Sequence, residues 1–220
     1  MGYEENKIEG RNAVLEAFRS GKTIDKLFVL DGCQDGPIKS ITREARKGDT
    51  IINYVNKERL DQISETGKHQ GVIAISAAYD YAEVEDILAN AESKGEAPFI
   101  IILDGIEDPH NLGAIIRTAN QAGAHGIIIP KRRAVGLTPT VARTSAGAIN
   151  YTPVAKVTNI TQTNKDLKDK GMWFVCADMD GTPMYDLNLT GSIGLVIGNE
   201  GDGVSKLVKE NCDMIATIPM

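Results

Sequence analysis

Residues 103–130 read LDGIEDPHNLGAIIRTANQAGAHGIIIP, and this stretch decides the fold of the second half of the chain. An apolar run ends at Asp104, a polar loop follows, and a helical pattern runs from near Asn111 to Gly123, where a second apolar run begins. The apolar stripe of that helix consists of Leu112, Ile115, Ile116, Ala119 and Ala122. Arg117 falls on its other side. Such short apolar runs around a helix predict strands buried on both faces of a parallel sheet.

The same alternation continues to the end of the chain. Five apolar runs follow residue 97, namely FIIIL, GIIIP, WFVCA, IGLVIG and MIATI. Thr138 followed by Pro139 is a helix-start signal, and Gly171 ends a further helical stretch. Residues 97–220 are therefore predicted to form an α/β domain with a mostly parallel sheet.

Residues 1–77 show a smaller α/β pattern. GRNAVLEAFRSG and PIKSITREARKG are predicted helices, and KLFVL, INYV and GVIAIS are predicted strands. Residues 78–96 follow as an acidic, partly helical linker that holds six acidic side chains and one basic one. Most of the net charge of −6 therefore lies in one segment, and an acidic total does not exclude nucleic acid as a partner.

Composition excludes several classes of protein. Hydrophobic residues make up 42% of the chain and charged residues 25%, as in ordinary globular proteins. The sequence has no apolar run long enough to span a bilayer and opens without a signal-peptide pattern, so we expect a cytoplasmic protein without a membrane partner. Cys33, Cys176 and Cys212 form no CxxC pair, and we expect three buried or half-buried thiols and no metal site.

A second candidate site is IGLVIGNEGDGVSKLV at residues 193–208, where an apolar run opens into a glycine-rich loop. Ligands of open α/β sheets bind beyond the carboxyl ends of strands, and glycines let the backbone approach them closely. The loop is neither GxGxxG nor GxxxxGK[ST], which argues against dinucleotides and nucleoside triphosphates. By spacing alone, Glu200 is either a functional carboxylate or a cap for backbone amides, Asn111 is a helix N-cap, and Arg117 is a solvated surface residue.

DPHNLGAIIRTANQAGAHGIIIP, VIGNEGDGVS and the final IPM resemble motif one, motif two and the opening of motif three of the SpoU/TrmH family, the ribose 2′-O-methyltransferases of the knotted SPOUT class. IEGRNAVLEAF at 8–18 and HQGVIA at 69–74 resemble the ends of the family's N-terminal substrate-binding domain. PKRRAVGLTPTVARTSAGA at 130–148 resembles the subgroup that methylates a guanosine in large-subunit ribosomal RNA. The resemblance covers nearly the whole chain.

The resemblance implies S-adenosylmethionine as cofactor, an RNA ribose 2′-hydroxyl as acceptor, and a homodimer with the site near its interface. It implies an RNA-binding domain at 1–77 and a trefoil-knotted methyltransferase domain at 97–220. Asn111, Arg117 and Glu200 match the catalytic positions. The positions expected at the cofactor are Ile197, Gly198, Gly201, Ile218 and Met220.

Two departures from the family pattern stand out. The subgroup continues after IPM with a glycine and a Ser-Leu-Asn segment, whereas this sequence stops at Met220, so we expect the end of motif three to be lacking. Asn150 stands where related sequences often carry glutamate.

RNA contacts are expected from basic and polar side chains, because phosphate contacts dominate affinity for nucleic acids. The candidates are Arg11, Asn12, Lys131, Arg132 and Arg133. His110 and His125 have no partner that the sequence identifies, and we expect both to be structural.

Ribosomal RNA is favoured over transfer RNA by the N-terminal domain. A transfer-RNA methyltransferase and a non-catalytic RNA-binding protein remain the alternatives, and a Rossmann-type methyltransferase is disfavoured because no glycine-rich loop follows the first strand.

For the reaction, our hypothesis is that Arg117 stays cationic, because an arginine with a pKa above about 12 is a poor proton acceptor near neutrality. It would hold a phosphate beside the target ribose and stabilise the developing alkoxide. The proton would leave to Glu200 or water, and Asn111 would orient Arg117 or Glu200.

Overall fold

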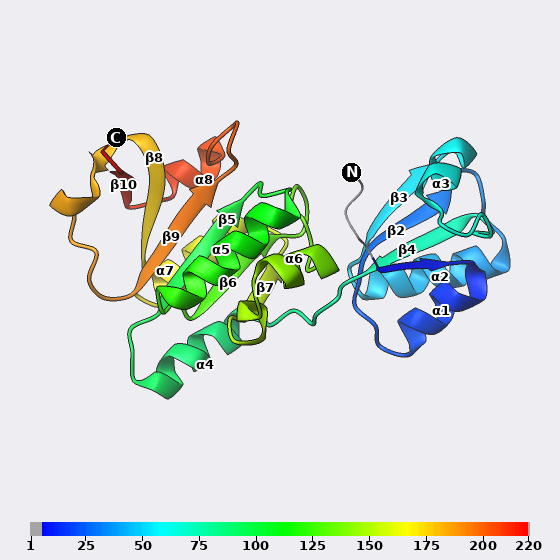
Figure 1. Ribbon diagram of the computed structural model, residues 1–220, viewed down its shortest axis with the longest axis horizontal. Helices are drawn as coiled ribbons and strands as arrows, with labels where there is room; N and C mark the ends of the chain where they lie inside the picture. The colour runs from blue at the N-terminus through cyan, green and yellow to red at the C-terminus, as the bar shows by residue number, and fades with distance from the viewer. Residues whose placement is uncertain (1–5, 220) are drawn as a thin grey trace. The chain divides into compact units, whose positions relative to one another are not determined.

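The computed structural model describes residues 6–219, which form two compact units (Figure 1). The first unit holds the chain up to Asp80 together with Gly136–Thr140, and the second holds Tyr81–Val135 and the chain from Val141 onward. Both are α/β structures, as predicted.

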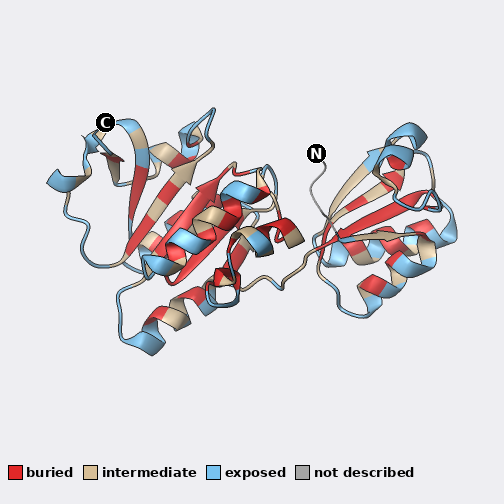
Figure 2. Ribbon diagram, viewed as in Figure 1, coloured by how far each residue is buried: buried red, intermediate tan, exposed pale blue. Residues whose placement is uncertain are grey.

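The first unit contains a four-stranded mixed sheet in the order β1-β4-β2-β3. Its strands are β1 (Asn6–Glu9), β2 (Ile24–Leu30), β3 (Ile51–Val55) and β4 (Val72–Ser76). Its helices are α1 (Arg11–Arg19), α2 (Gly36–Lys47) and α3 (Lys57–Ile63). Side chains alternate along β4, so that Val72 and Ala74 pack with α1 and α2, whereas Ile73 and Ile75 pack with Leu60 of α3. The helices therefore cover both faces of the sheet (Figure 2).

The second unit contains a six-stranded, all-parallel sheet in the order β10-β8-β9-β5-β6-β7. Its strands are β5 (Phe99–Asp104), β6 (Gly126–Pro130), β7 (Val154–Val157), β8 (Trp173–Pro183), β9 (Ile193–Gly198) and β10 (Met214–Thr217). Its helices are α4 (Val84–Lys94), α5 (Pro109–Gln121), α6 (Pro139–Thr144), α7 (Ile160–Asp169) and α8 (Lys206–Glu210), with 3-10 turns at Ala148–Asn150 and Met184–Asp186. The predicted parallel sheet is confirmed, and the trefoil knot stays a prediction.

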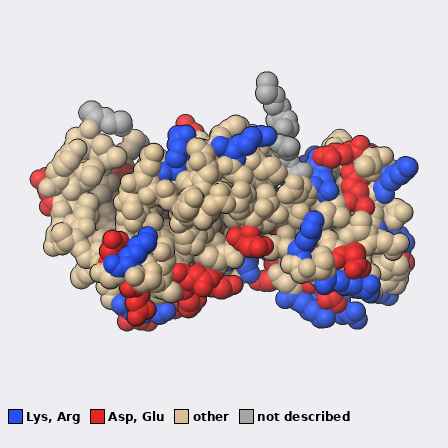
Figure 3. Space-filling view, turned by 60° about the horizontal axis from the view of Figure 1, so that its bottom comes forward, with Lys and Arg blue, Asp and Glu red and all other residues tan. Residues whose placement is uncertain are grey.

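The acidic segment 78–96 differs from the predicted linker, because most of it belongs to the second unit. Glu83 and Asp86 form a capping box at the start of α4, and Ile87 is fully buried. A Cβ atom on Gly126 of β6 would lie only 2.7 Å from Ile87 Cδ1, so α4 lies directly on the sheet. The charges of this segment occupy the outer side of a packed helix (Figure 3).

Three further features bear on the sequence predictions. Among residues 6–219, no helix is long and apolar enough to cross a membrane. Cys176 is buried and Cys33 and Cys212 are half-buried, all as free thiols. Strands β1 and β7, with the sequences NKIE and VAKV, were not predicted.

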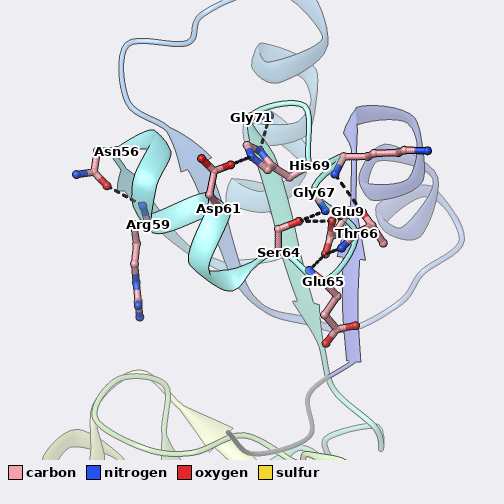
Figure 4. Close-up of polar contacts among 11 residues, drawn as sticks. Glu9, Asn56, Arg59, Asp61, Ser64, Glu65, Thr66, Gly67, His69 and Gly71 are labelled. Carbon is pink, nitrogen blue, oxygen red and sulfur yellow. Dashed lines mark hydrogen bonds and ion pairs between the residues drawn. The ribbon is translucent and has the colours of Figure 1, made fainter.

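The first unit is tied together by the carboxylate of Glu9, at the end of β1 (Figure 4). Its two oxygens accept hydrogen bonds from the Ser64 and Thr66 hydroxyls and from the Glu65 and Thr66 amides. Partial burial raises the pKa of Glu9, but these four hydrogen bonds outweigh burial and lower its pKa to about 2. The ionised side chain therefore holds the loop that follows α3 against β1.

We predict that this carboxylate makes the first unit sensitive to acid. Because its pKa is lowered by folding, its stabilisation is fully present above its ordinary pKa of 4.5 and is lost as the pH falls towards 2. At pH 7, Glu9→Gln should lower the free energy of unfolding by about 1–2 kcal/mol. Urea unfolding followed by circular dichroism should show this difference shrinking at pH 3. Glu16→Gln, in the exposed pair with Arg19, is the control, and a pH-independent difference would contradict the assignment.

Candidate active site

Two loops meet at the carboxyl edge of the parallel sheet in the second unit. Strands β5 and β9 are neighbours, and Asp104 at the end of β5 lies opposite Gly198 at the end of β9. The loops that leave these strands, residues 105–108 and 199–205, therefore start side by side. This is the edge at which open α/β sheets bind their ligands.

Asn199 joins the two loops. Its Nδ2 donates a hydrogen bond of 2.8 Å to the Gly105 carbonyl, and its Oδ1 accepts one of 2.8 Å from the Gly201 amide. Its backbone also exchanges two hydrogen bonds with Gly203, at 2.9 and 3.0 Å. The loop is thus folded back on itself, with Glu200 and Gly201 at its turn. Sequence reasoning missed Asn199 and offered the role of amide cap to Glu200, which the structure corrects.

Gly198 is required by this turn. A Cβ atom at this position would collide with the backbone of Gly203 and Val204, which pack directly over it. Any side chain here would push the loop away from the end of β9. The resemblance predicts that Gly198 contacts the cofactor. The packing of the loop over Gly198 is a second, structural reason for a glycine at this position.

Asp104 is the second residue that sequence reasoning missed. It is buried, and its Oδ2 accepts a hydrogen bond of 2.8 Å from the amide of Ser205, the N-cap residue of α8. Asp104 thereby fixes the far end of the glycine-rich loop. The signal in the sequence was an acidic residue that ends an apolar strand.

A cleft of about 450 Å³ lies between the two loops. Its lining residues are Ile106, Glu107, Asp108, Asn111, Asn199, Glu200 and Gly201. Asn111 and Glu200, two of the three predicted catalytic residues, therefore share one cleft with Gly201. Both side chains are exposed and can reach a substrate.

The start of α5 corrects one sequence interpretation. Asp108, not Asn111, is the N-cap, and its carboxylate accepts a hydrogen bond of 2.6 Å from the His110 amide. Asn111 is the third residue of the helix, within its first turn, and Asp108 already serves as the cap. The following Gly113 is tightly packed, since a Cβ atom there would lie 2.6 Å from Thr144 Cβ. Close packing of α5 thus fixes the position of Asn111.

Arg117 does not line this cleft. It is exposed on α5, six residues beyond Asn111, which is about 9 Å along a helix axis. The structure therefore places Arg117 outside the core and outside the set of residues that line this cleft. On the predicted apolar stripe of α5, Ala122 is also exposed, because it is the C-cap residue.

The predicted cofactor positions lie at two strand ends. Ile197 and Gly198 end β9, Gly201 lies in the cleft, and Ile218 follows β10 with 67% of its surface exposed. Met220 lies outside the described residues. Gly203 has a φ of +69°, which favours glycine, and no described atom lies within 4 Å of the place that a Cβ atom would take, so its backbone is open to close approach by a ligand.

The predicted RNA contacts lie in both units. Lys131, Arg132 and Arg133 follow β6 at the same sheet edge, and Arg133 lines a cavity of about 160 Å³ with Glu107 and Asp202. In the first unit, Asn12 is exposed. The guanidinium of Arg11 is already paired within the protein. Its Nη2 lies 2.6 Å from Asp35 Oδ2, and its Nε donates a hydrogen bond of 3.1 Å to the Gln70 carbonyl.

His125 and His110 differ in burial. His125 is buried, its Nδ1 accepts a hydrogen bond of 2.9 Å from the Phe99 amide, and its Nε2 lies 2.9 Å from Glu96. The prediction that it is structural agrees with these contacts, and Glu96 is the partner that the sequence did not identify. His110 is exposed beside the cleft.

A cleft at the carboxyl edge of an all-parallel sheet, lined by side-chain amides and carboxylates, is typical of the ligand sites of α/β enzymes. Residues 98–220 match the SpoU rRNA Methylase family, and residues 7–82 match the RNA 2′-O ribose methyltransferase substrate binding family. The chain therefore belongs to the SpoU rRNA Methylase family. It is a TrmH-family, S-adenosylmethionine-dependent RNA ribose 2′-O-methyltransferase.

Individual relatives agree with this assignment. The TrmH family tRNA/rRNA methyltransferase YacO of Bacillus subtilis is 46% identical over 100% of this chain and 88% of its own length. The structure of an AdoMet-bound rRNA methyltransferase from Sinorhizobium meliloti matches 99% of this chain and 79% of its own, with 23% identity and a TM-score of 0.57. The A. aeolicus TrmH/SpoU tRNA modifying enzyme matches 57% of this chain and 64% of its own, with 25% identity and a TM-score of 0.50.

We predict that Asn199 is required for the shape of the cleft. Asn199→Ala removes the bond to Gly105 and the cap on Gly201, and it should lower methyl transfer to RNA at least about tenfold, the effect of about 1.4 kcal/mol. Asn199→Asp keeps the acceptor for the Gly201 amide but turns a carboxylate oxygen towards the Gly105 carbonyl oxygen, so it should also lower the rate. Asn188→Ala, which removes a similar cap in a distant exposed turn, is the control. Equal rates for Asn199→Ala and Asn188→Ala would contradict this role.

Proposed function

We propose that the protein methylates the ribose 2′-hydroxyl of a guanosine in large-subunit ribosomal RNA. The observation that carries the proposal is the cleft in which Asn111 and Glu200 come together from the loops after β5 and β9. Residues 130–148 support the guanosine subgroup, because they resemble it from end to end.

The substrate-binding unit supports ribosomal RNA over transfer RNA. The rRNA methyltransferase structure from Sinorhizobium meliloti matches nearly the whole chain, whereas the tRNA modifying enzyme from A. aeolicus matches little more than half of it. A larger RNA target gives a reason for a separate binding unit. The names of the curated relatives leave both RNAs open, so the choice needs an experiment.

In the proposed reaction, S-adenosylmethionine supplies a methyl group activated by its sulfonium. Residues of both loops hold the acceptor ribose, and alignment can contribute roughly 7 to 11 kcal/mol in well-oriented cases. Glu200 accepts the proton of the 2′-hydroxyl, directly or through water, as the new carbon–oxygen bond forms and the sulfur–methyl bond breaks, with its electron pair left on a neutral thioether. Asn111, fixed by the packing of α5, orients Glu200. Arg117 stays cationic, binds a phosphate beside the target and stabilises negative charge on the ribose oxygen.

The proposal includes a homodimer. Arg117 is not among the residues that line the cleft with Asn111 and Glu200, and it is exposed on α5, where a second copy can contact it. In a twofold dimer, the same surface of each copy contacts its partner, and two equivalent sites are completed at the interface. We therefore infer that Arg117 of one copy serves the cleft of the other. Exposed Met179, Leu207 and Ile218 provide apolar surface near the end of the chain for such contacts.

The substrate is tested with unmodified transcripts. The full chain is incubated with S-adenosylmethionine carrying a tritiated methyl group and with large-subunit ribosomal RNA or a pool of transfer RNAs. We expect transfer to ribosomal RNA, with none from the Glu200→Gln variant. Transfer to the transfer RNAs alone would contradict the proposed substrate. Binding of RNA without transfer to either would instead support a non-catalytic RNA-binding protein.

A further inference from the structure

Helix α2 of the first unit presents four basic side chains on one face. They are Lys39, Arg43, Arg46 and Lys47, and we call them the α2 basic stripe. At 100° per residue these positions fall within an arc of roughly 100°. The opposite face of α2 is buried against the sheet through Ile38, Ile41 and Ala45. The packing of the helix therefore directs all four charges to solvent.

Acidic neighbours neutralise little of this charge. Glu44 is the one acidic residue of α2, and its carboxylate contacts Lys47 at 3.1 Å and Arg43 at 3.4 Å. The hydrogen bond from Lys47 lowers the pKa of Glu44, so it is ionised at neutral pH. With four basic residues and one acidic residue, α2 carries a charge of about +3. Residues 1–77 contain equal numbers of basic and acidic side chains, so the unit concentrates positive charge on this helix.

The stripe is accessible. The side chains of Arg43 and Lys47 are 69% and 65% exposed, and Lys39 and Arg46 are also exposed. Figure 3 shows Lys and Arg atoms gathered over this part of the first unit. Exposed ion pairs such as Glu44–Lys47 are weak in water, so they yield readily to a stronger anion.

The helix dipole explains only part of this pattern. Arg46 and Lys47 lie in the last turn, where cations are favoured by the carbonyl end of the helix. Lys39 and Arg43 lie earlier, where this effect has faded. The stripe also includes no exposed large apolar residue, and lysine is depleted at protein interfaces. A polyanion fits it better than a protein partner.

We propose that the α2 basic stripe binds the phosphate backbone of the substrate RNA and supplies the first unit's main electrostatic contact. The inference rests on the proposed function for the identity of the RNA, and it adds a surface that Arg11 and Asn12 do not include. From Lys39 to Lys47 the helix rises about 12 Å, roughly the axial length over which one strand of a duplex places three or four phosphates. Arg11, held by Asp35, is less able to take this role.

The test compares two variants of the full chain that lose the same charge. The stripe variant is Lys39→Gln, Arg43→Gln and Arg46→Gln, and the control is Lys22→Gln, Lys57→Gln and Arg59→Gln, at exposed positions elsewhere in the first unit. Glutamine is a good helix former, and circular dichroism checks that both variants fold. Binding of labelled large-subunit ribosomal RNA transcript is titrated from low to high KCl.

The stripe variant should bind about tenfold or more weakly at low salt. Its slope of log affinity against log salt should fall by about two to three, since each phosphate contact contributes about 0.7 to 0.9. The control should stay within about twofold of the unaltered chain. Equal losses in both variants, or an unchanged slope in the stripe variant, would overturn the proposal.

The kinetics of methyl transfer distinguish a failure of this inference from a failure of the proposed function. The stripe variant should show a raised KM for RNA with an unchanged kcat, because the cleft is untouched. A fall in kcat with unchanged KM would overturn the proposed binding role. If the unaltered chain transfers no methyl group, the proposed function fails, and the salt slopes still decide whether the stripe binds RNA.

Discussion

Strands β5 and β9 pair in parallel up to Asp104 and Gly198, and the candidate site depends on this pairing together with the side chain of Asn199. The pairing starts two loops at the same point, and the Asn199 amide then ties one to the other. Gly198 lets the second loop fold back, and Asp104 holds its far end through Ser205. Glu200 is therefore positioned by the bonds of Asn199 and Asp104, and Asn111 by the packing of α5.

Most of the fold could be predicted because its signals are local. The apolar runs FIIIL and GIIIP correctly predicted strands β5 and β6. Proline or glycine correctly marked several helix ends. The errors have a common physical origin. β1 and β7 are strands of only four residues, too short to stand out as apolar runs, and they pair with β4 and β6. α4 looked like a linker because its charges are abundant, whereas its position depends on Ile87 packing at Gly126.

The candidate site could be predicted less completely. Motif resemblance found Asn111 and Glu200, which line one cleft. Sequence reasoning missed the roles of Asn199 and Asp104 because their hydrogen-bond partners, Gly105 and Ser205, are 94 and 101 residues away in the chain. Spacing could not show that Asp108 caps α5, nor that Arg11 is already paired with Asp35. It also could not show that Arg117 lies outside the cleft, which is the observation behind the proposed dimer.

The central claim is that a dimer shares its active sites, with Arg117 from one copy and Glu200 from the other. The direct measurement mixes two inactive variants, Arg117→Ala and Glu200→Ala, by co-expression and assays methyl transfer to ribosomal RNA. Random pairing leaves one intact site in each mixed dimer, so about a quarter of the unaltered activity should return. A mixture of Asn111→Ala and Glu200→Ala, both from one cleft, should stay inactive. No recovery in the first mixture, with dimers present, would contradict the account.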